Sequence, residues 1–388
     1  MILKNCTALI DGKLTENILI EFENDKIIRA EAVEKDAEIE EDSVDMGGMI
    51  VSPGFIDQHV HGAVGYDFMD GSEEAITSIL EALAREGVTS ILAATTTGTN
   101  DDIVNALDAI KDFDNAHGVE ILGIHLEGPY LSPEAPGAHR KELLAKPTVE
   151  SFRTYQNEAG GKISMITLAV EEDEGFELTK YLRQHGVVVS IGHSNASYDQ
   201  TLEAIEAGCQ CATHCYNAMK GLHHRDAGVV GAALLTKGFK AELIVDRIHV
   251  SDPAICVFDK MKSSQDKILI TDAMRAKGLC SGTYDLGGQQ VYSNGIEVRT
   301  KEGALAGSVL TMDRALKNYM DVTGRRLEEV LLMMTKNPAE LQQVYDRKGS
   351  ISVGKDADLV VLDKELKVQM TICRGKVVYS TNHENNSC

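Results

Sequence analysis

The sequence predicts an α/β protein: a (β/α)8 barrel of the TIM type, with one small β domain formed by the two ends of the chain. Three observations lead to this prediction. Between residues 53 and 345, apolar strand-like runs alternate with amphipathic helical stretches. The first 50 and the last 40 residues instead hold short Val- and Ile-rich runs separated by Gly and Asp-Gly turns. The length of 388 residues suits a barrel of about 250 residues with an accessory domain.

Eight candidate strands can be counted in the central region, which is the number that this kind of barrel requires. Helical stretches such as "EEAITSILEALAREG" lie between them. We therefore expect residues 53–345 to form the barrel, and residues 1–52 and 346–388 to form the small domain. The eight runs are residues 54–62, 89–96, 120–128, 163–171, 187–194, 209–216, 242–250 and 267–274.

Composition limits the classes of function. The net charge of -22 argues against binding to nucleic acid or to an anionic membrane, and an anionic substrate would need a local basic site. No apolar run reaches the roughly 18–20 residues of a membrane span, and the N-terminus does not look like a signal peptide. Eight cysteines without a regular spacing indicate reduced thiols, so we expect a cytoplasmic protein.

Metal ligands and acids lie where six of the eight predicted strands end. In a TIM barrel these ends form the mouth that carries the catalytic groups. One such residue could be an ordinary polar side chain, but six strands ending in this way are hard to obtain by chance. The residues are His59 and His61, Glu127, His193, His214, His249 and Asp272.

The spacing of these residues suggests two sets of metal ligands. Residues i and i+2 of a strand share a face, so His59 and His61 both face the barrel axis and can chelate one ion. Glu127, His193 and His214 form a second set, typical of a hydrolytic zinc site with an open position for water. His125 shares a face with Glu127 but lies deeper, which favours a supporting or core role over ligation.

The segment "CQCATHCY" (209–216) also resembles a metal-binding finger at first sight. Strand alternation places His214 on one face and both Cys211 and Cys215 on the other. If His214 faces the axis, these cysteines face the surrounding helices as buried apolar side chains. Cys209 begins the strand, far from the mouth. We therefore expect His214 to be the ligand and the cysteines to be packing residues.

Two loops on the same side have less specific signals. The loop "HHRDAG" (223–228) follows the sixth strand, and its histidines and arginine suit either an anion site or a solvated loop. The stretch "LAGS" (305–308) after the eighth strand is a tight turn of small residues, also on the side of the chemistry.

With these residues placed, the sequence resembles the amidohydrolase superfamily, and within it the N-acetylglucosamine-6-phosphate deacetylase family. The resemblance covers nearly the whole chain, and "HLEGP", "H-x-YNAM" and "TDAM" distinguish this branch. Many two-metal amidohydrolases bridge their ions with a carboxylated lysine on the fourth strand, but "ITLAVE" has none, so the resemblance implies that Glu127 takes this place. The matching segments are "PGFIDQHVHG" (53–62), "GIHLEGPYLSPEAPGAH" (123–139), "SIGHSNA" (190–196), "THCYNAM" (213–219), "HHRDAGVVG" (223–231), "IVDRIHV" (244–250), "ITDAMRAKG" (270–278), "LAGSVLTMD" (305–313), "NPA" (337–339) and "GSISVGKDADLVVLD" (349–363).

The resemblance also implies a fold, cofactors and partners. The fold would be a distorted (β/α)8 barrel with a small β-sandwich built from both chain ends. Each subunit would bind one or two divalent ions, with zinc as the first expectation and iron, manganese or cobalt as alternatives. Arg225, with or without His224, would hold a phosphate, and this loop would reach into the neighbouring subunit of a homodimer. The sugar site would be lined by Ala138, His139, Asn217, Ala218, His249 and the backbone of Leu305, Ala306 and Gly307.

The expected reaction is hydrolysis of N-acetyl-D-glucosamine 6-phosphate to D-glucosamine 6-phosphate and acetate, in amino-sugar catabolism and cell-wall sugar recycling. Asp272 would act as general base and then general acid, while His249 or the metal stabilises the oxyanion. The alternatives are another amidohydrolase acting on a related N-acyl amino sugar or cyclic amide, a metal-free scaffold of the same fold, and a sugar-phosphate binding module. Retention of every expected ligand and of Asp272 argues against the last two.

The chain departs from the common pattern of the family at a few positions. Arg247, Ala63 and Val64 stand where glycine is usual, and Cys215 replaces a bulky apolar residue. Ala227 lies in the "RDAG" segment, which lacks the usual proline. None of these is an expected ligand. Arg247 would add positive charge near an anionic substrate.

Overall fold

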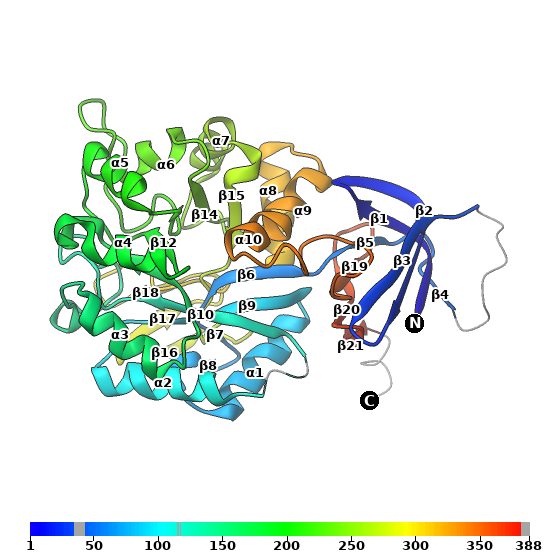
Figure 1. Cartoon of the computed structure of the whole chain (residues 1–388), viewed down its shortest axis with the longest axis horizontal. Helices are drawn as coiled ribbons and strands as arrows, with labels where there is room; N and C mark the ends of the chain where they lie inside the picture. The colour runs from blue at the N-terminus through cyan, green and yellow to red at the C-terminus, as the bar shows by residue number, and fades with distance from the viewer. Residues whose placement is uncertain (35–42, 115, 117, 382–388) are drawn as a thin grey trace.

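The computed structural model describes residues 1–34, 43–114, 116 and 118–381. Figure 1 shows two bodies side by side. One is a barrel with helices packed around its strands. The other is a smaller sheet, in which the blue N-terminal strands lie beside the red C-terminal strands.

The barrel sheet has eight strands in the order β15-β14-β13-β12-β11-β10-β9-β6, and each neighbouring pair is parallel. The edge strands meet at one end, where Val60 bridges to Ala273 and the Asp272 N–H donates to the His59 carbonyl oxygen at 2.9 Å. The predicted barrel is confirmed. It is distorted, because β13 has two residues. The strands are β6 (Phe55–Val60), β9 (Val88–Thr95), β10 (Glu120–Glu127), β11 (Ile163–Leu168), β12 (Val188–Ile191), β13 (Cys211–Ala212), β14 (Lys240–Ile244) and β15 (Lys267–Ile270).

Helices cover the outside of the barrel, and short polar caps begin several of them. Ser72 accepts the Ala75 N–H at the start of α1, and Ser197 forms a reciprocal capping box with Gln200 at the start of α5. The α-helices are α1 (Glu73–Ala84), α2 (Asn100–Asp112), α3 (Val149–Glu158), α4 (Glu177–Gln184), α5 (Tyr198–Ala207), α6 (Gly228–Leu235), α7 (Asp252–Met261), α8 (Met312–Thr323), α9 (Leu327–Met334) and α10 (Lys336–Leu341). Short 3-10 helices are η1 (Phe68–Asp70), η2 (Lys141–Leu143), η3 (Val170–Glu172), η4 (Glu174–Phe176) and η5 (Ser264–Asp266).

Alternation along the barrel strands separates two apolar layers. Outward side chains such as Ile91 and Leu243 belong to the large core that also contains buried helix residues such as Ile79 and Leu107. The inward layer is smaller and fills the barrel interior below the mouth. It contains Leu92, Met165, Val188, Cys211, Ile244, Ile268 and Ile270.

The two ends of the chain share one eight-stranded sheet, in the order β21-β20-β19-β5-β1-β2-β3 with β4 against β1. It buries a core of its own around Leu3, Ile20 and Leu359. The exact domain boundaries stay a prediction. The strands are β1 (Ile2–Ile10), β2 (Lys13–Glu23), β3 (Lys26–Ala32), β4 (Ser43–Asp45), β5 (Ile50–Pro53), β19 (Leu359–Leu362), β20 (Val368–Cys373) and β21 (Lys376–Ser380).

A buried lysine links this sheet to the base of the barrel. Lys348 Nζ lies 2.7 Å from Glu120 at the start of β10 and 3.1 Å from Asp356, and it also contacts Asp358. These three carboxylates are close enough to hold a cation, and the lysine ammonium already supplies that charge.

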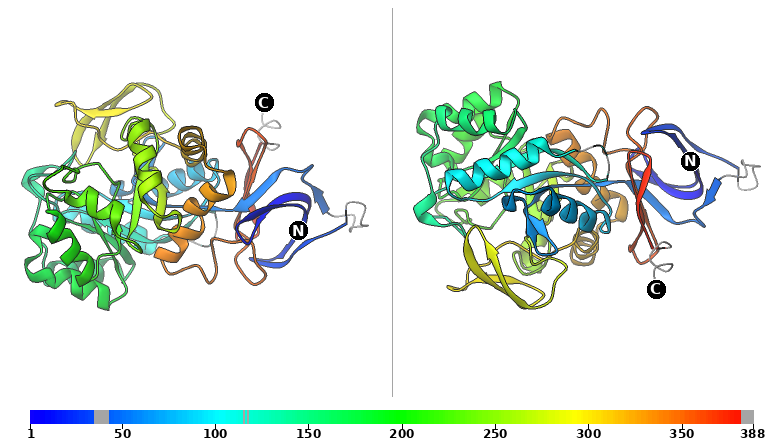
Figure 2. Two further views of the ribbon diagram at one scale, coloured as in Figure 1. Left: turned by 90° about the horizontal axis from the view of Figure 1, so that it is seen from above. Right: turned by 90° about the horizontal axis from the view of Figure 1, so that it is seen from below.

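Two small antiparallel sheets were not predicted from the sequence. β7 (Gly62–Ala63) pairs with β8 (Tyr66–Asp67) directly after β6. β16 (Gly282–Leu286), β17 (Gln289–Ser293) and β18 (Val298–Thr300) form a three-stranded sheet after β15. Figure 2 shows this sheet, in yellow, projecting from one side of the barrel, away from the terminal sheet.

In the part of the chain that the structure describes, no helix has the length and apolar character needed to cross a bilayer.

Candidate active site

A cavity of about 280 Å³ opens at the end of the barrel where the predicted ligands gather. It lies at the carboxyl ends of the strands, as the barrel fold predicts. His59 is fully buried beneath it. The lining residues are His61, Thr96, Glu127, Gly137, Ala138, His139, His193, His214, Asn217, Ala218, His249, Asp272, Leu286, Ala304, Leu305 and Gly307.

Glu127, the last residue of β10, lies between the two predicted sets of ligands. Its Oε1 is 3.4 Å from His193 Nε2 and 3.3 Å from His214 Nε2. Its Oε2 is 3.1 Å from His61 Nε2 and 3.5 Å from His59 Nε2. One carboxylate therefore faces two pairs of imidazoles, in the arrangement of a bridging ligand.

Asp272 lies beside the histidine pair of β6. Its Oδ1 is 3.2 Å from His61 Nε2 and 3.6 Å from His59 Nε2, and the two imidazole Nε2 atoms are 3.3 Å apart. His139, which was expected at the sugar, also approaches the cluster, with Nε2 at 3.6 Å from Glu127 Oε2. Its Nδ1 lies 3.3 Å from Thr96 Oγ1.

The chemistry of these donors fits divalent metal ions. The donor atoms of His59, His61 and Asp272 lie within 4.8 Å of one another, and so do those of Glu127, His139 and His193. The buried Nδ1 atoms of His61 and His214 have no hydrogen-bond partner. No hydrogen bond at Nδ1 therefore forces either ring to carry its proton on Nε2, the nitrogen that faces the cluster. Imidazole and carboxylate donors of this kind suit zinc and related transition metals.

The electrostatics of the cluster agree with this donor chemistry. Burial raises the pKa of Glu127, but the surrounding imidazoles, His59 first, hold that pKa well below its usual value. Burial, followed by the neighbouring His139, lowers the pKa of His193 to about 4. Burial opposes the charged form of His61, yet the hydrogen bonds that its ring donates to Asp272 and Glu127 raise its pKa to about 10. The carboxylates therefore attract positive charge to the place where a cation would bind.

Three residues of the cluster have left-handed backbone. The φ angles are 48° at His193, 30° at His214 and 49° at Asp272, and each residue follows the end of its strand by two positions. L-residues adopt this region at a cost of about 1–3 kcal/mol, and such strain concentrates at functional sites.

This backbone explains an error in the prediction for β13. Alternation predicted that Cys211 faces the helices, but it lies in the inward layer with Met165 and Val188. The strand ends at Ala212, and the left-handed turn at His214 reorients that ring toward the axis. Cys215 does lie in the outer core, as predicted, and Cys209 lies there too. Burial raises the pKa of the Cys215 thiol to about 12, so it is a packing residue at neutral pH.

His125 is excluded as a ligand, because both of its ring nitrogens have protein partners. Its Nδ1 lies 3.2 Å from the Gln58 carbonyl oxygen, and its Nε2 lies 2.7 Å from Thr167 Oγ1. Burial, followed by the neighbouring His59, lowers its pKa to about 3, so the ring is neutral.

Sequence reasoning missed two carboxylates that contact imidazoles of the predicted site. Glu242 Oε2 lies 3.3 Å from His59 Nδ1, and Asp246 Oδ2 lies 2.6 Å from His249 Nδ1. A charged residue within the apolar strand "ELIVD" was the available signal for Glu242. Nothing in the sequence separates Asp246 from an ordinary loop aspartate.

Three of the residues expected at the substrate do not line this cavity. Ala306 is buried in an apolar cluster with Met274, and its N–H donates to the Val298 carbonyl oxygen. His224 and Arg225 are exposed, and they contact each other at 2.8 Å.

Arg247 was expected to add positive charge near the substrate, but it is not among the lining residues. Its guanidinium instead forms an exposed two-atom ion pair with Asp252. Its φ of 67° lies in the left-handed region. This backbone suits glycine, the residue that the resemblance implied at this position.

A barrel with imidazoles and a shared glutamate at its mouth is the arrangement of a metal-dependent hydrolase. The chain belongs to the amidohydrolase family, whose model matches residues 50–378. The N-acetylglucosamine-6-phosphate deacetylase of Bacillus subtilis (strain 168) is 42% identical to it over 335 residues, which are 85% of each chain. The N-acetylgalactosamine-6-phosphate deacetylase of Escherichia coli is 37% identical over 330 residues, covering 84% of this chain and 87% of the relative.

Solved structures show the same similarity. The crystal structure of N-acetylglucosamine-6-phosphate deacetylase from Pasteurella multocida matches with a TM-score of 0.91 and 30% identity, over 97% of this chain and 98% of that chain. A mutant of the Mycobacterium smegmatis enzyme, in complex with N-acetyl-D-glucosamine-6-phosphate, matches with a TM-score of 0.92 and 28% identity, over 98% and 99%.

Proposed function

We propose that this protein hydrolyses N-acetyl-D-glucosamine 6-phosphate to D-glucosamine 6-phosphate and acetate, in amino-sugar catabolism and cell-wall sugar recycling. The observation that carries the proposal is the cluster at this cavity, in which Glu127 contacts four imidazoles and Asp272 contacts two of the same four. The similarity to deacetylases of N-acetylhexosamine 6-phosphates supports the substrate class.

We assign a divalent metal ion to Glu127, His193 and His214, and a second ion to His59 and His61 beside the same glutamate. Zinc is the first choice, with iron, manganese or cobalt as alternatives, because the donors are imidazole nitrogens and carboxylate oxygens. When bound, such an ion lowers the pKa of water toward about 7 and polarises the amide carbonyl.

Asp272 is the acid–base group of the proposed reaction. Burial raises its pKa, but His59 and His61 hold that pKa below its usual value, so it starts as a carboxylate. It takes a proton from water as the water oxygen forms a bond to the acetamide carbon. It then gives the proton to the nitrogen as the C–N bond breaks, which releases acetate and the amine.

His249 is placed to donate a hydrogen bond to the carbonyl oxygen. Its Nδ1 is held by Asp246, which leaves Nε2 as the nitrogen available to the cavity that the ring lines. Burial opposes protonation of this ring, but the hydrogen bond to Asp246 raises its pKa. A protonated Nε2 therefore stabilises the negative charge that develops on the oxygen.

The phosphate needs a cation that one chain does not supply at its own cavity. Among the described residues that line the cavity, there is no lysine or arginine. We propose that the protein is a homodimer in which the exposed Arg225, with His224 beside it, binds the phosphate in the partner's cavity. We also propose a cytoplasmic location, which the free thiols of the described cysteines support.

The reaction is tested by acetate release from the purified, metal-loaded protein. We expect kcat/KM to be highest for N-acetylglucosamine 6-phosphate, lower for N-acetylgalactosamine 6-phosphate, and lowest for unphosphorylated N-acetylglucosamine. A higher kcat/KM for N-acetylgalactosamine 6-phosphate than for N-acetylglucosamine 6-phosphate would make the galactosamine compound the assigned substrate. Absence of release from all three would reject the proposal.

The phosphate assignment is tested with Arg225→Ala and with Arg140→Ala as the matched control. Arg140 follows the lining residue His139, but its Nε is paired with Glu142 at 2.9 Å. We expect only Arg225→Ala to raise KM strongly for the phosphorylated sugar and to change turnover of N-acetylglucosamine little. Mixing Asp272→Asn with Arg225→Ala subunits should restore one complete cavity per heterodimer. Subunits that exchange without any return of activity would place the arginine in its own chain's site or elsewhere.

A further inference from the structure

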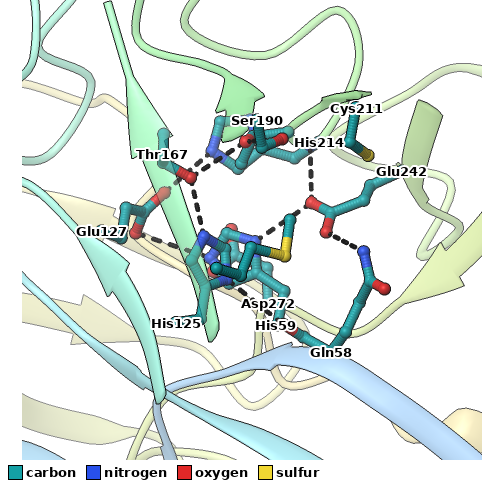
Figure 3. Close-up of polar contacts among 12 residues, drawn as sticks. Gln58, His59, His125, Glu127, Thr167, Ser190, Cys211, His214, Glu242 and Asp272 are labelled. Carbon is teal, nitrogen blue, oxygen red and sulfur yellow. Dashed lines mark hydrogen bonds and ion pairs between the residues drawn. The ribbon is translucent and has the colours of Figure 1, made fainter. Parts of the chain in front are cut away.

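A buried carboxylate lies directly behind the two sets of metal ligands. Glu242, on β14, is completely inaccessible to solvent. Its Oε2 is 3.3 Å from His59 Nδ1, and the same oxygen accepts the backbone N–H of His214 at 3.2 Å. Figure 3 shows the Glu242 carboxylate between Gln58 and the imidazoles, with Glu127 on the opposite side of those rings. One side chain therefore contacts a residue of each ligand set.

A neighbouring amide fixes which oxygen of Glu242 faces the histidine. The Oε1 of Gln58 accepts a hydrogen bond from Gln342 Nε2 at 3.2 Å, so the Gln58 amide nitrogen points the other way. That nitrogen donates to Glu242 Oε1 at 2.6 Å. Oε1 is thereby occupied by a donor, and Oε2 is left to accept from His59 and His214.

The ring of His59 has carboxylates on both sides, so its proton has two possible places. Glu242 lies behind Nδ1, while Glu127 and Asp272 lie 3.5 and 3.6 Å from Nε2. A neutral imidazole carries one proton and can bind a metal only through the bare nitrogen. A proton on Nε2 would block the atom that faces His61, whereas a proton on Nδ1 leaves it free.

We propose that Glu242 is a positioning residue that keeps the proton of His59 on Nδ1, so that Nε2 is free to bind a metal ion beside His61. The proposal rests on the metal sites of the proposed function, but it concerns metal binding alone and needs no substrate. Hydrogen bonds of this kind behind a ligating histidine orient the ring and raise its basicity, and their loss typically weakens metal binding by about 10–100-fold.

The decisive variant is Glu242→Gln, which keeps the shape of the side chain. Its amide oxygen must turn toward the Gln58 amide, so its NH2 group faces His59 Nδ1 and the His214 N–H. His59 Nδ1 must then accept, which moves its proton to Nε2. We expect zinc affinity at the His59/His61 pair to fall by about 10–100-fold, with the ion at Glu127, His193 and His214 retained. Zinc is measured by titration of the apo protein and by metal analysis.

The double variant Gln58→Glu with Glu242→Gln reverses the direction of this hydrogen bond. The carboxylate introduced at position 58 would accept from Gln342 and from the amide NH2 introduced at position 242. The oxygen of that new amide would then again face His59 Nδ1. We expect the double variant to recover most of the zinc affinity that Glu242→Gln loses. Cys211→Ala is the packing control, because Cys211 lies in the inward layer of the same barrel interior and its thiol faces the Ala212 carbonyl oxygen at 3.6 Å.

Histidine-selective nitrogen NMR of the zinc-loaded wild-type protein tests the same point without a substitution. The His59 ring should carry its proton on Nδ1, with Nε2 unprotonated. A proton on Nε2 would overturn the proposal, and so would Glu242→Gln protein with unchanged zinc stoichiometry and affinity. If Glu242→Gln does not fold, the NMR result alone decides. Neither readout depends on turnover, so failure of the deacetylase assay would leave this test intact.

Discussion

The residues of the proposed site reach the barrel mouth in two different ways. His59 and His61 belong to one extended segment, β6 and the residue after it, and ordinary strand alternation turns both rings toward the axis. His193, His214 and Asp272 lie beyond their strands, each in left-handed backbone. The first pair needs only local geometry. The second group depends on the surrounding structure to hold a conformation that the isolated chain avoids.

Tertiary hydrogen bonds hold the strained group in place. The Ser132 N–H donates to the His193 carbonyl oxygen, and the Cys215 N–H donates to the Glu242 carbonyl oxygen. The carbonyl oxygen of Asp272 accepts the Ser308 N–H at 2.7 Å. Each bond comes from a segment distant in sequence, so these residues are positioned only when the whole barrel has formed.

The largest expected effect comes from Glu127→Gln, which removes the group shared by the two regions. Both metal ions should be lost and turnover should fall by more than about 10³-fold, because water then keeps a pKa far above about 7. Metal analysis and acetate release measure the two effects. His61→Ala and His193→Ala are the controls, and each should release only the ion of its own set. Two ions retained in Glu127→Gln would show that the carboxylate is not shared.

Asp272→Asn should reduce kcat by about 10²–10⁴-fold, the usual contribution of a general acid–base group. The zinc content and KM should stay close to those of the wild type. Measuring zinc content together with kcat separates the role of acid–base group from the role of metal ligand. Both roles must be considered, because the donor atoms of Asp272, His59 and His61 lie close enough to hold one ion. If the variant loses the ion at His59 and His61 as well as kcat, Asp272 is a ligand of that ion.

Asp246→Asn should reduce activity by about 10–100-fold at neutral pH, since hydrogen bonds to charged groups contribute about 1.5–3 kcal/mol. The pKa of His249 is raised, so its charged form is complete below the ordinary value of 6.5 and is lost as the pH rises through the raised value. Without Asp246, the alkaline limb of kcat/KM should move to lower pH. The acid limb should not move, because the pKa of Asp272 is held low by His59 and His61. An unchanged alkaline limb would show that His249 does not act in its charged form.

The smallest expected effect concerns Arg247, a residue outside the cluster that has the same left-handed backbone. Arg247→Gly and Arg247→Ala both remove the exposed pair with Asp252, so their difference reports the backbone alone. Glycine ordinarily loses more entropy on folding than alanine, but here it should be the more stable variant by about 1 kcal/mol. Thermal unfolding measures the order. An alanine variant more stable than the glycine variant would contradict the backbone explanation.

The sequence by itself determined the parts of this protein that depend on local periodicity. Eight apolar runs predicted eight barrel strands, and the His-x-His spacing of β6 predicted that His59 and His61 share a face. The depth of His125 within its strand correctly predicted a supporting role. These conclusions need only the repeat of two residues along a strand.

Tertiary structure alone decided the rest, because left-handed turns and long-range contacts leave no periodic signal. Alternation failed for Cys211 once β13 ended at Ala212 and the chain turned at His214. Glu242 became a partner of His59 only because β14 and β6 face the same barrel interior, 183 residues apart in sequence. A buried carboxylate is recognised by what it contacts, and a sequence does not contain those contacts.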